Sequence, residues 1–182
     1  MRTKQSILLA LGLTAMAVAP LAGQQAIGNT NIDMAGYLKI STEAARHRET
    51  RRLTEAEFIW MSKESGTVVL DARSHELFTM MHVKGAVNLS FPDISVDTLA
   101  KSLPDKSQRI LIYCNNNFQN SPVAFPYKIA PASLNLSTYI ALYSYGYTNV
   151  YELGPLLDVK TTKIEFETKS APAARPRAAS KQ

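Results

Sequence analysis

Short apolar blocks alternate with polar and charged blocks along the chain, and they predict strands and helices in turn. Apolar runs bounded by Gly, Pro, Asn or charged residues are typical of buried strands, and they occur at residues 67–71, 82–89, 110–113 and 149–153. Apolar residues at helical spacing predict helices at residues 55–63, 76–81, 96–103 and 132–145. Buried strands alternating with helices predict a single α/β domain, with a central, mainly parallel sheet flanked by helices.

Local signals set the expected ends of these helices. Thr54 followed by Glu57 is a capping-box pattern, and it predicts a helix with Phe58 and Met61 on its inner face. Ser95 or Asp97 is the expected cap of the third helix. Pro131 suits the start of the last helix, whose expected inner face is Leu136, Tyr139, Ile140 and Tyr143.

The first 23 residues have the features of a bacterial signal peptide. Arg2 and Lys4 precede an apolar stretch from Ile7 to Leu13, and small residues follow at 15–23. We therefore expect a periplasmic or secreted protein. An uncleaved N-terminal anchor is the alternative, although the stretch is shorter than the roughly 20 apolar residues of a stable membrane insertion.

The remaining chain divides by composition. Residues 24–51 predict an irregular lead-in followed by a charged arm or solvated helix face, and residues 52–157 form the expected domain. Residues 158–182 are a C-terminal extension that ends in a basic, Ala- and Pro-rich tail, which is typical of disorder.

The positive charge of the chain lies at its two ends. The net charge is +5, yet residues 1–23 and 169–182 hold six of the 20 basic residues and no acidic residue. The middle of the chain keeps 14 basic residues against 15 acidic residues. Because the expected domain has almost no net charge, we expect no nucleic-acid partner.

The most informative residue is Cys114, which is the only cysteine and directly follows the apolar run at residues 110–113. The carboxyl end of a central strand is where open α/β sheets place their ligand crevices. A lone cysteine has no partner for an intramolecular disulfide. It is therefore either a small apolar filler or a reactive group.

Four ordered segments of the chain resemble the rhodanese-like domain family. The resemblance covers about residues 52–156, and its segments are Asp71-Ala72-Arg73-Ser74, Glu76-Leu77-Phe78, His82-Val83-Lys84-Gly85-Ala86-Val87-Asn88 and Gly146-Tyr147-Thr148-Asn149-Val150-Tyr151. The resemblance implies that Cys114 heads a loop of backbone amides and carries a persulfide between a sulfur donor and an acceptor. The thiolate is the form of cysteine that attacks sulfur.

The resemblance also assigns roles around Cys114. The implied active loop and its nearest cation are Asn115, Asn116, Asn117, Phe118, Gln119, Asn120 and Lys128. Asn tolerates left-handed backbone, so the Asn triplet suits an amide cradle, and turn-forming polar filler is the alternative. The expected structural supports are Asp71, Arg73, His82 and Gly85: an ion pair at a strand end, a brace for a turn, and a turn glycine.

The loop after Cys114 departs from the family pattern. Residues 115–121 hold no charge, and Pro122, Pro126 and Pro131 prevent an early helix. The lack of an arginine disfavours a phosphatase. An uncharged loop favours a neutral or protein-bound persulfide over thiosulfate as the donor. The additional segment 121–131 contains Val123, Phe125 and Tyr127, and we expect it to pack over the site.

Three functions remain open from the sequence. The first is an exported sulfane-sulfur carrier or sulfurtransferase, which takes sulfur from a small donor or a protein-bound persulfide. The second is a catalytically inactive binding module of the cell envelope with a protein partner, and the third is a redox-sensing thiol. We expect no cofactor and no metal, because the three histidines are spread over different elements.

Overall fold

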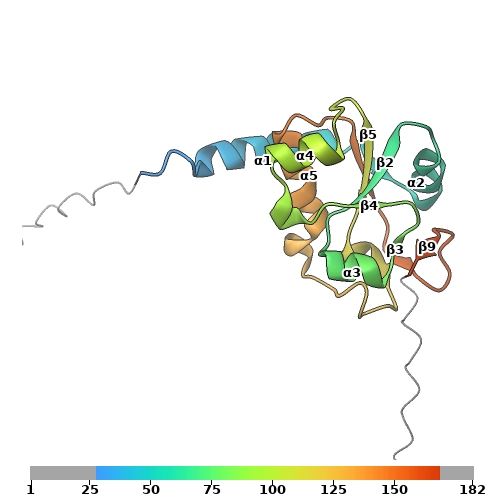
Figure 1. The fold of residues 1–182 in the computed structure, drawn as a ribbon. Coiled ribbons are helices and arrows are strands. Elements are labelled where there is room, and N and C mark those ends of the chain that lie inside the picture. The colour runs from blue at the N-terminus through green and yellow to red at the C-terminus, as the bar shows by residue number, and fades with distance from the viewer. Residues whose placement is uncertain (1–27, 169–182) are drawn as a thin grey trace, which may run out of the picture. The chain divides into compact units, whose positions relative to one another are not determined.

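The central element of the computed structural model, which describes residues 28–168, is a five-stranded parallel sheet (Figure 1). The strands follow the order β1 (Arg52–Leu53), β7 (Val150–Leu153), β5 (Arg109–Tyr113), β2 (Thr67–Asp71) and β4 (Val87–Asn88). The predicted α/β class with a flanked parallel sheet is confirmed. The predicted signal peptide and basic tail lie outside the described residues.

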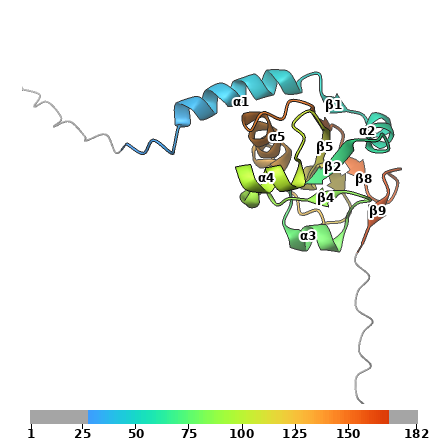
Figure 2. The ribbon, with the colours of Figure 1, turned by 45° about the horizontal axis from the view of Figure 1, so that its top comes forward.

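Helices cover both faces of the sheet (Figures 1 and 2). One core cluster packs side chains from α1 (Met34–Arg48), α4 (Val96–Ser102) and α5 (Leu134–Ser144) against the sheet. The other cluster contains side chains from α2 (Glu55–Ser62). A parallel sheet buried on both faces explains why its strands are continuous apolar runs.

Alternation along β5 decides which side chains reach each face. Leu111 and Tyr113 belong to the core on the α2 side, whereas Ile110 and Ile112 belong to the core on the α5 side. Successive side chains of a strand point to opposite faces. Cys114 directly follows Tyr113, so its side chain is directed to the α5 side.

Smaller elements complete the domain. β3 (His82–Val83) follows α3 (His75–Met80) and pairs antiparallel with β9 (Phe166–Glu167), while β6 (Phe118–Gln119) pairs in parallel with β8 (Leu157–Asp158). Three short 3-10 helices are Phe91–Asp93, Asn115–Asn117 and Ala130–Ala132. The chain after β7 therefore packs on the domain through strand pairing and the buried side chain of Ile164.

Two of the predicted helix starts are confirmed. Thr54 Oγ1 accepts the amide of Glu57, and the Glu57 carboxylate accepts the amide of Thr54, which forms the capping box at α2. Phe58 and Met61 are buried as expected. Ser95 caps α4.

The start predicted for the last helix is wrong, whereas its predicted inner face is confirmed in part. Pro131 lies in a separate 3-10 turn, and α5 begins at Leu134. Its buried residues are Asn135, Thr138, Tyr139 and Leu142, and the predicted Ile140 and Tyr143 pack partly buried against the same core. The helix therefore also places two polar side chains, Asn135 and Thr138, on its buried face.

The predicted irregular lead-in is wrong for residues 34–40, which are helical, and the helix continues into the predicted charged segment. Residues 34–48 form α1, which packs on α5 and buries Ala44. Arg48 at its carboxyl end pairs with the buried carboxylate of Glu152. The charged arm is therefore partly an interface and not only a solvated face.

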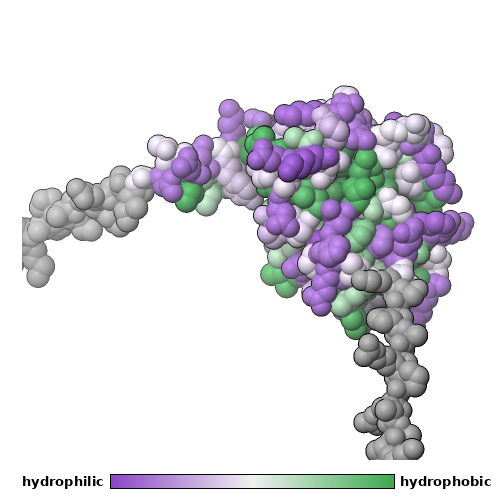
Figure 3. Space-filling model, viewed as in Figure 1, coloured by the Kyte–Doolittle hydropathy of each residue, from purple (hydrophilic) through white to green (hydrophobic). Residues whose placement is uncertain are grey.

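The surface of the described residues contains both apolar and hydrophilic side chains. Figure 3 shows apolar residues between α4 and β2, with hydrophilic residues around them. Within residues 28–168, no helix has the length and apolar character that a membrane span requires.

His47 gives the docking of α1 a dependence on pH. Its Nδ1 lies 2.9 Å from the Tyr139 hydroxyl, and its Nε2 accepts from Arg51 Nε at 3.0 Å. Burial and the charge of Arg51 lower the pKa of His47. The unfolded chain therefore binds a proton more readily, and stability is lost as pH falls below about 6.5. Between pH 7.5 and 5.5, we expect the melting temperature of His47→Gln to fall less than that of the wild type. Circular dichroism measures both. An equal fall in both proteins would contradict this role.

Candidate functional site around Cys114

Cys114 lies at the carboxyl end of β5 and is 1% exposed. Its Sγ lies 3.4 Å from the hydroxyl oxygen of Ser133, the residue that directly precedes α5. The amino end of α5 carries a partial positive charge from its first backbone amides. The thiol therefore contacts a group at the positive end of the helix that covers this face.

The side chain of Asn117 fixes the backbone at Cys114. Its Oδ1 accepts the Cys114 amide at 2.9 Å and Asn135 Nδ2 at 3.0 Å. Its Nδ2 donates to the carbonyls of Leu153 at 2.7 Å and Pro155 at 3.2 Å. One buried amide side chain thus connects the ends of β5 and β7 with the start of α5.

We expect Asn117→Ala to lower the free energy of unfolding by about 2–4 kcal/mol, because it leaves several buried polar groups without a partner. Asn116→Ala is the matched control. Among residues 28–168, the Asn116 side chain bonds only to the exposed Lys128 backbone, so this variant should lose less than about 1 kcal/mol. Urea unfolding measures both changes. Equal losses would show that Asn117 is not the connecting residue.

The Asn triplet does not use left-handed backbone. Residues Asn115–Asn117 form a right-handed 3-10 turn, and within the described residues the only non-glycine with positive φ is Asn120, at 64°. The amides of Asn117 and Phe118 donate to the carbonyls of Cys114 and Asn115. The chain then leaves as β6. Two of the loop amides are therefore already paired with carbonyls inside the turn.

The other predicted loop residues have separate positions. Phe118 is buried in the core beside Tyr113, whereas Gln119 is exposed at β6. Asn120 Nδ2 donates to Asp158 Oδ2 at 2.7 Å. The backbone amide of Lys160, with Asn120 as a second donor, lowers the pKa of Asp158.

Lys128 lies at a different cavity from the thiol. Asn115, Lys128 and Arg73 contribute to the lining of a cavity of 390 Å³ that does not include Cys114. Asn116 holds the Lys128 backbone through both of its amide atoms. The structure thus brings Lys128 to the loop, and it does not bring the side chain to the thiol cavity.

The additional segment 121–131 packs beside the site rather than over it. Phe125 and Ala124 are buried, and the Phe125 ring contacts the rings of Phe118 and Phe166. Val123 and Tyr127 are exposed. No residue of this segment lines the cavity at Cys114. The expected cover is absent there because the segment anchors on the α2 side of the sheet.

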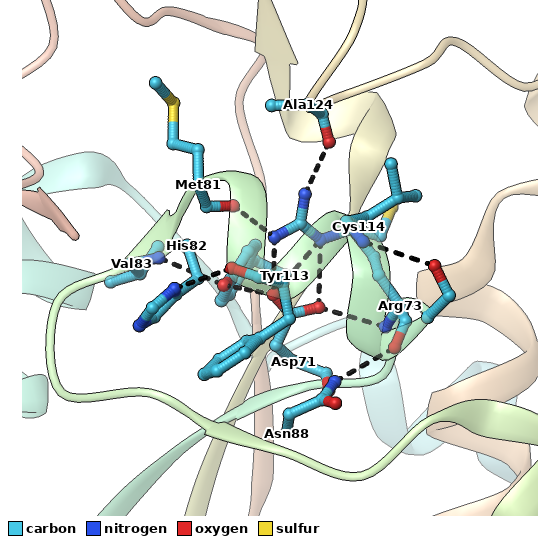
Figure 4. Close-up of polar contacts among 12 residues, drawn as sticks. Asp71, Arg73, Met81, His82, Val83, Asn88, Tyr113, Cys114 and Ala124 are labelled. Atoms are coloured by element: carbon cyan, nitrogen blue, oxygen red, sulfur yellow. Dashed lines mark hydrogen bonds and ion pairs between the residues drawn. The ribbon is translucent and has the colours of Figure 1, made fainter. Parts of the chain in front are cut away.

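Arg73 provides that anchor (Figure 4). Its guanidinium donates to both Asp71 carboxylate oxygens and to the carbonyls of Ala124 and Met81, each at 2.7 Å. It also lies 4.3 Å from the centre of the Phe125 ring. Both Arg73 and Asp71 are buried, so this ion pair belongs to the core.

Tyr113 joins the same network (Figure 4). Its hydroxyl donates to Asp71 Oδ2 at 2.5 Å and accepts the Val83 amide at 3.0 Å. Burial, and secondly the charge of Asp71, raise the pKa of Tyr113 well above its usual value. The phenol therefore remains a hydrogen-bond donor to Asp71 at physiological pH.

His82 and Gly85 lie around the turn after α3. His82 Nδ1 lies 2.7 Å from the Phe78 carbonyl, its ring stacks on Phe78, and its Nε2 lies 3.4 Å from Glu167. Gly85 has a φ of 75°, which a side chain would strain. Both residues act on the turn between α3 and β4.

A polar cavity of 120 Å³ lies beside the thiol. Cys114, Ser133 and Asn135 line it together with Arg48, Arg52 and Glu152. Arg52 and Glu152 are register partners on β1 and β7, and Glu152 is the register partner of Ile112 on β5. Cys114 lies two residues beyond Ile112, so all three side chains reach the same face.

Sequence reasoning missed Arg48, Arg52, Glu152 and Ser133. Glu152 is an acidic residue inside an apolar strand, and a charged residue in that place requires a buried partner. That signal was present in the sequence. The partners come from the segment before the expected domain core, and only the pairing of β1 with β7 identifies them.

Several known proteins are similar to this chain. The chain is 26% identical over 96 residues to the thiosulfate sulfurtransferase PspE of Escherichia coli K12, covering 53% of this chain and 77% of that protein. The BH2092 protein of Bacillus halodurans is 24% identical with a TM-score of 0.48, covering 70% of this chain and 86% of that chain. The rhodanese-like domain of Alr3790 from Anabaena sp. is 21% identical with a TM-score of 0.47, covering 72% and 89%.

The match that decides the family is to the rhodanese-like domain itself, and it extends over residues 54–153. More than half of the chain lies within it. The chain therefore belongs to the rhodanese-like domain family.

Proposed function

We propose that this protein is an exported sulfurtransferase or sulfane-sulfur carrier that acts through a persulfide on Cys114. One observation carries the proposal: the lone thiol ends the central strand of a rhodanese-like domain and lines a polar cavity with two arginines. Open α/β sheets place ligands at the carboxyl ends of their strands. The cavity lies at that edge, where β5 and β7 end.

The reaction divides into two displacements. The Cys114 thiolate attacks the outer sulfur of a donor, the bond between that sulfur and the donor breaks, and the donor fragment leaves with the electron pair. A nucleophilic acceptor then attacks the terminal sulfur of the persulfide, and the Cys114 thiolate leaves. With thiosulfate the first leaving group is sulfite, and with cyanide the second product is thiocyanate.

The surrounding residues can support the charge in both steps. The Ser133 hydroxyl lies within hydrogen-bond distance of the sulfur and can donate to it. The first amides of α5 contribute a partial positive charge. Asn117 holds the Cys114 backbone in place, so the sulfur keeps its position while the bonded group changes.

Transfer of sulfur from thiosulfate to cyanide tests the proposal. Thiosulfate is the first donor to use, since the similar protein of Escherichia coli is a thiosulfate sulfurtransferase. Residues 24–182 are incubated with both compounds, and thiocyanate is measured against time. We expect formation proportional to enzyme concentration. A rate equal to that of the mixture without protein, with thiosulfate and with a small persulfide donor, would overturn the proposal.

A catalytically inactive binding module is the second candidate, and the burial of Cys114 favours it. The exposed Val123, Tyr127 and Ile129 of segment 121–131 offer apolar contacts to a protein partner. Iodoacetamide labelling separates the two candidates. A thiol that reacts in the folded protein at a rate near that of an unfolded control supports transfer. Labelling only on unfolding, together with a partner lost on Tyr127→Ser, supports the binding module.

Export rests on the pattern of residues 1–23. The mass of the protein recovered from a bacterial periplasmic fraction tests it. Removal of a segment ending between residues 19 and 23 is expected, and the full-length mass would contradict cleavage.

A further inference from the structure

We propose that Arg52, with Arg48 and Glu152 behind it, forms an anion-binding site that receives the oxygen-bearing end of an anionic sulfur donor. The proposal rests on the proposed function for its reaction. It adds which residues of this chain hold the sulfur–oxygen end of a small anionic donor such as thiosulfate. The loop after Cys114 offers no such charge.

The Arg52 guanidinium has hydrogen-bond donors that the described residues do not use. Its side chain is 51% exposed, and its Nε lies 3.2 Å from Glu152 Oε1 while its Nη2 lies 3.3 Å from the Gly154 carbonyl. Both contacts are long, and Nη1 has no hydrogen-bond partner among residues 28–168. A guanidinium presents its donors in a planar fork that matches paired oxygens.

Arg48 and Glu152 fix the position of Arg52. Arg48 donates to both carboxylate oxygens of Glu152, through Nε at 2.6 Å and through Nη2. Glu152 is 2% exposed, so its charge is compensated in place. The cavity lining therefore carries two arginines against one carboxylate, which leaves one positive charge beside the thiol.

The polar lining also limits where an anion can lie in the cavity. Asn135 is 6% exposed, and its Oδ1 has no hydrogen-bond partner among the described residues. Asn135 lines the cavity with Cys114 and Arg52. The anion carries acceptors only and cannot donate to this oxygen, so its oxygens lie on the Arg52 side of the cavity. A volume of 120 Å³ holds on the order of four water-sized groups, which suits a small oxyanion.

The two arginines come from outside the loop after Cys114. The family match begins at residue 54, whereas Arg48 and Arg52 precede it on α1 and β1. Strand pairing places Arg52 beside Glu152 at the edge of the sheet where Cys114 lies. The charge thus reaches the thiol from the N-terminal flank and not from the loop after the cysteine.

The chemistry at this site follows from these positions. The oxygens of the donor lie on Arg52, and its outer sulfur faces Cys114. The thiolate attacks this sulfur, the sulfur–sulfur bond breaks, and sulfite or a sulfinate leaves with the electron pair. Arg52 stabilises the leaving anion because its charge lies where negative charge develops.

The test compares Arg52→Gln with Arg51→Gln. Arg51 is next in sequence, but its guanidinium lies over the Tyr151 ring and it does not line the cavity. We expect Arg52→Gln to lower the second-order rate of persulfide formation from thiosulfate about 10-fold or more. Arg51→Gln should change it less than about 2-fold. Both variants should react with uncharged iodoacetamide at the wild-type rate. Equal losses with both reagents for Arg52→Gln would indicate a structural role and overturn the proposal.

Anion binding is measured separately on Cys114→Ser, which transfers no sulfur. Titration with thiosulfate, followed by amide chemical shifts, should give saturable changes at residues around the cavity. These changes should weaken at least about 5-fold in Cys114→Ser/Arg52→Gln. If thiosulfate binds but the wild type forms no persulfide, the anion-binding site is supported and the proposed sulfurtransferase function is contradicted. If persulfide forms at equal rates with and without Arg52, the proposed sulfurtransferase function is supported and the anion-binding site is contradicted.

Discussion

Replacement of Arg73 by methionine is expected to lower the free energy of unfolding by about 3–5 kcal/mol. The variant removes the cation from a buried pair and leaves the Asp71 carboxylate without compensation. It also removes the donors to the carbonyls of Met81 and Ala124, so α3 and segment 121–131 lose their common anchor. Because a domain of this size loses about 2–4 °C per kcal/mol, the melting temperature should fall by about 6–20 °C.

Arg109→Met is the matched control. Arg109 is also at a strand of the sheet and pairs with an acid, but both side chains of the Arg109–Glu64 pair are about one third exposed. A pair accessible to solvent contributes about 1 kcal/mol or less. Calorimetry on the two variants measures the contrast. Losses of the same size would show that the burial of Arg73 is not what makes its pair important.

Replacement of Cys114 by serine is expected to reduce thiocyanate formation to the rate of the uncatalysed mixture. A hydroxyl group does not take sulfur from a donor under these conditions, because it is not ionised at neutral pH and is a poor nucleophile. The Ser133 hydroxyl can hydrogen-bond to the new side chain, so the stability should change by about 1 kcal/mol at most.

Cys114→Ala extends this test. It removes the nucleophile without adding a buried polar atom, and it should be as inactive as the serine variant. Thermal unfolding of both variants shows whether the fold is kept. Turnover that persists in two folded variants would mean that sulfur transfer does not pass through Cys114.

Most of the fold follows from local patterns in the sequence. The apolar runs at residues 67–71 and 110–113 have few alternatives to buried strands, and Thr54 with Glu57 satisfies the amides at the start of α2. Gly85 occupies a backbone conformation that favours glycine. In each case the signal and the structure depend on neighbouring residues only.

The remaining errors concern contacts between distant segments. The amphipathic pattern of α1 is weak, so its residues resemble a solvated arm until Arg48 is placed on Glu152. The polar inner face of α5 requires Asn117, which lies 18 residues earlier, as the partner of Asn135. The thiol cavity likewise depends on β1 beside β7. Periodicity along the chain contains no information about such pairs.

The central claim is that Cys114 accepts sulfane sulfur, and the intact mass of the protein tests it most directly. The chain has one cysteine, so any sulfur bound as a persulfide is located without ambiguity. After incubation with thiosulfate and removal of the donor, the wild type should gain one sulfur atom, about 32 Da, that a thiol reductant removes. Cys114→Ser should gain nothing. An unchanged mass of the wild type with thiosulfate and with a persulfide donor would contradict the account.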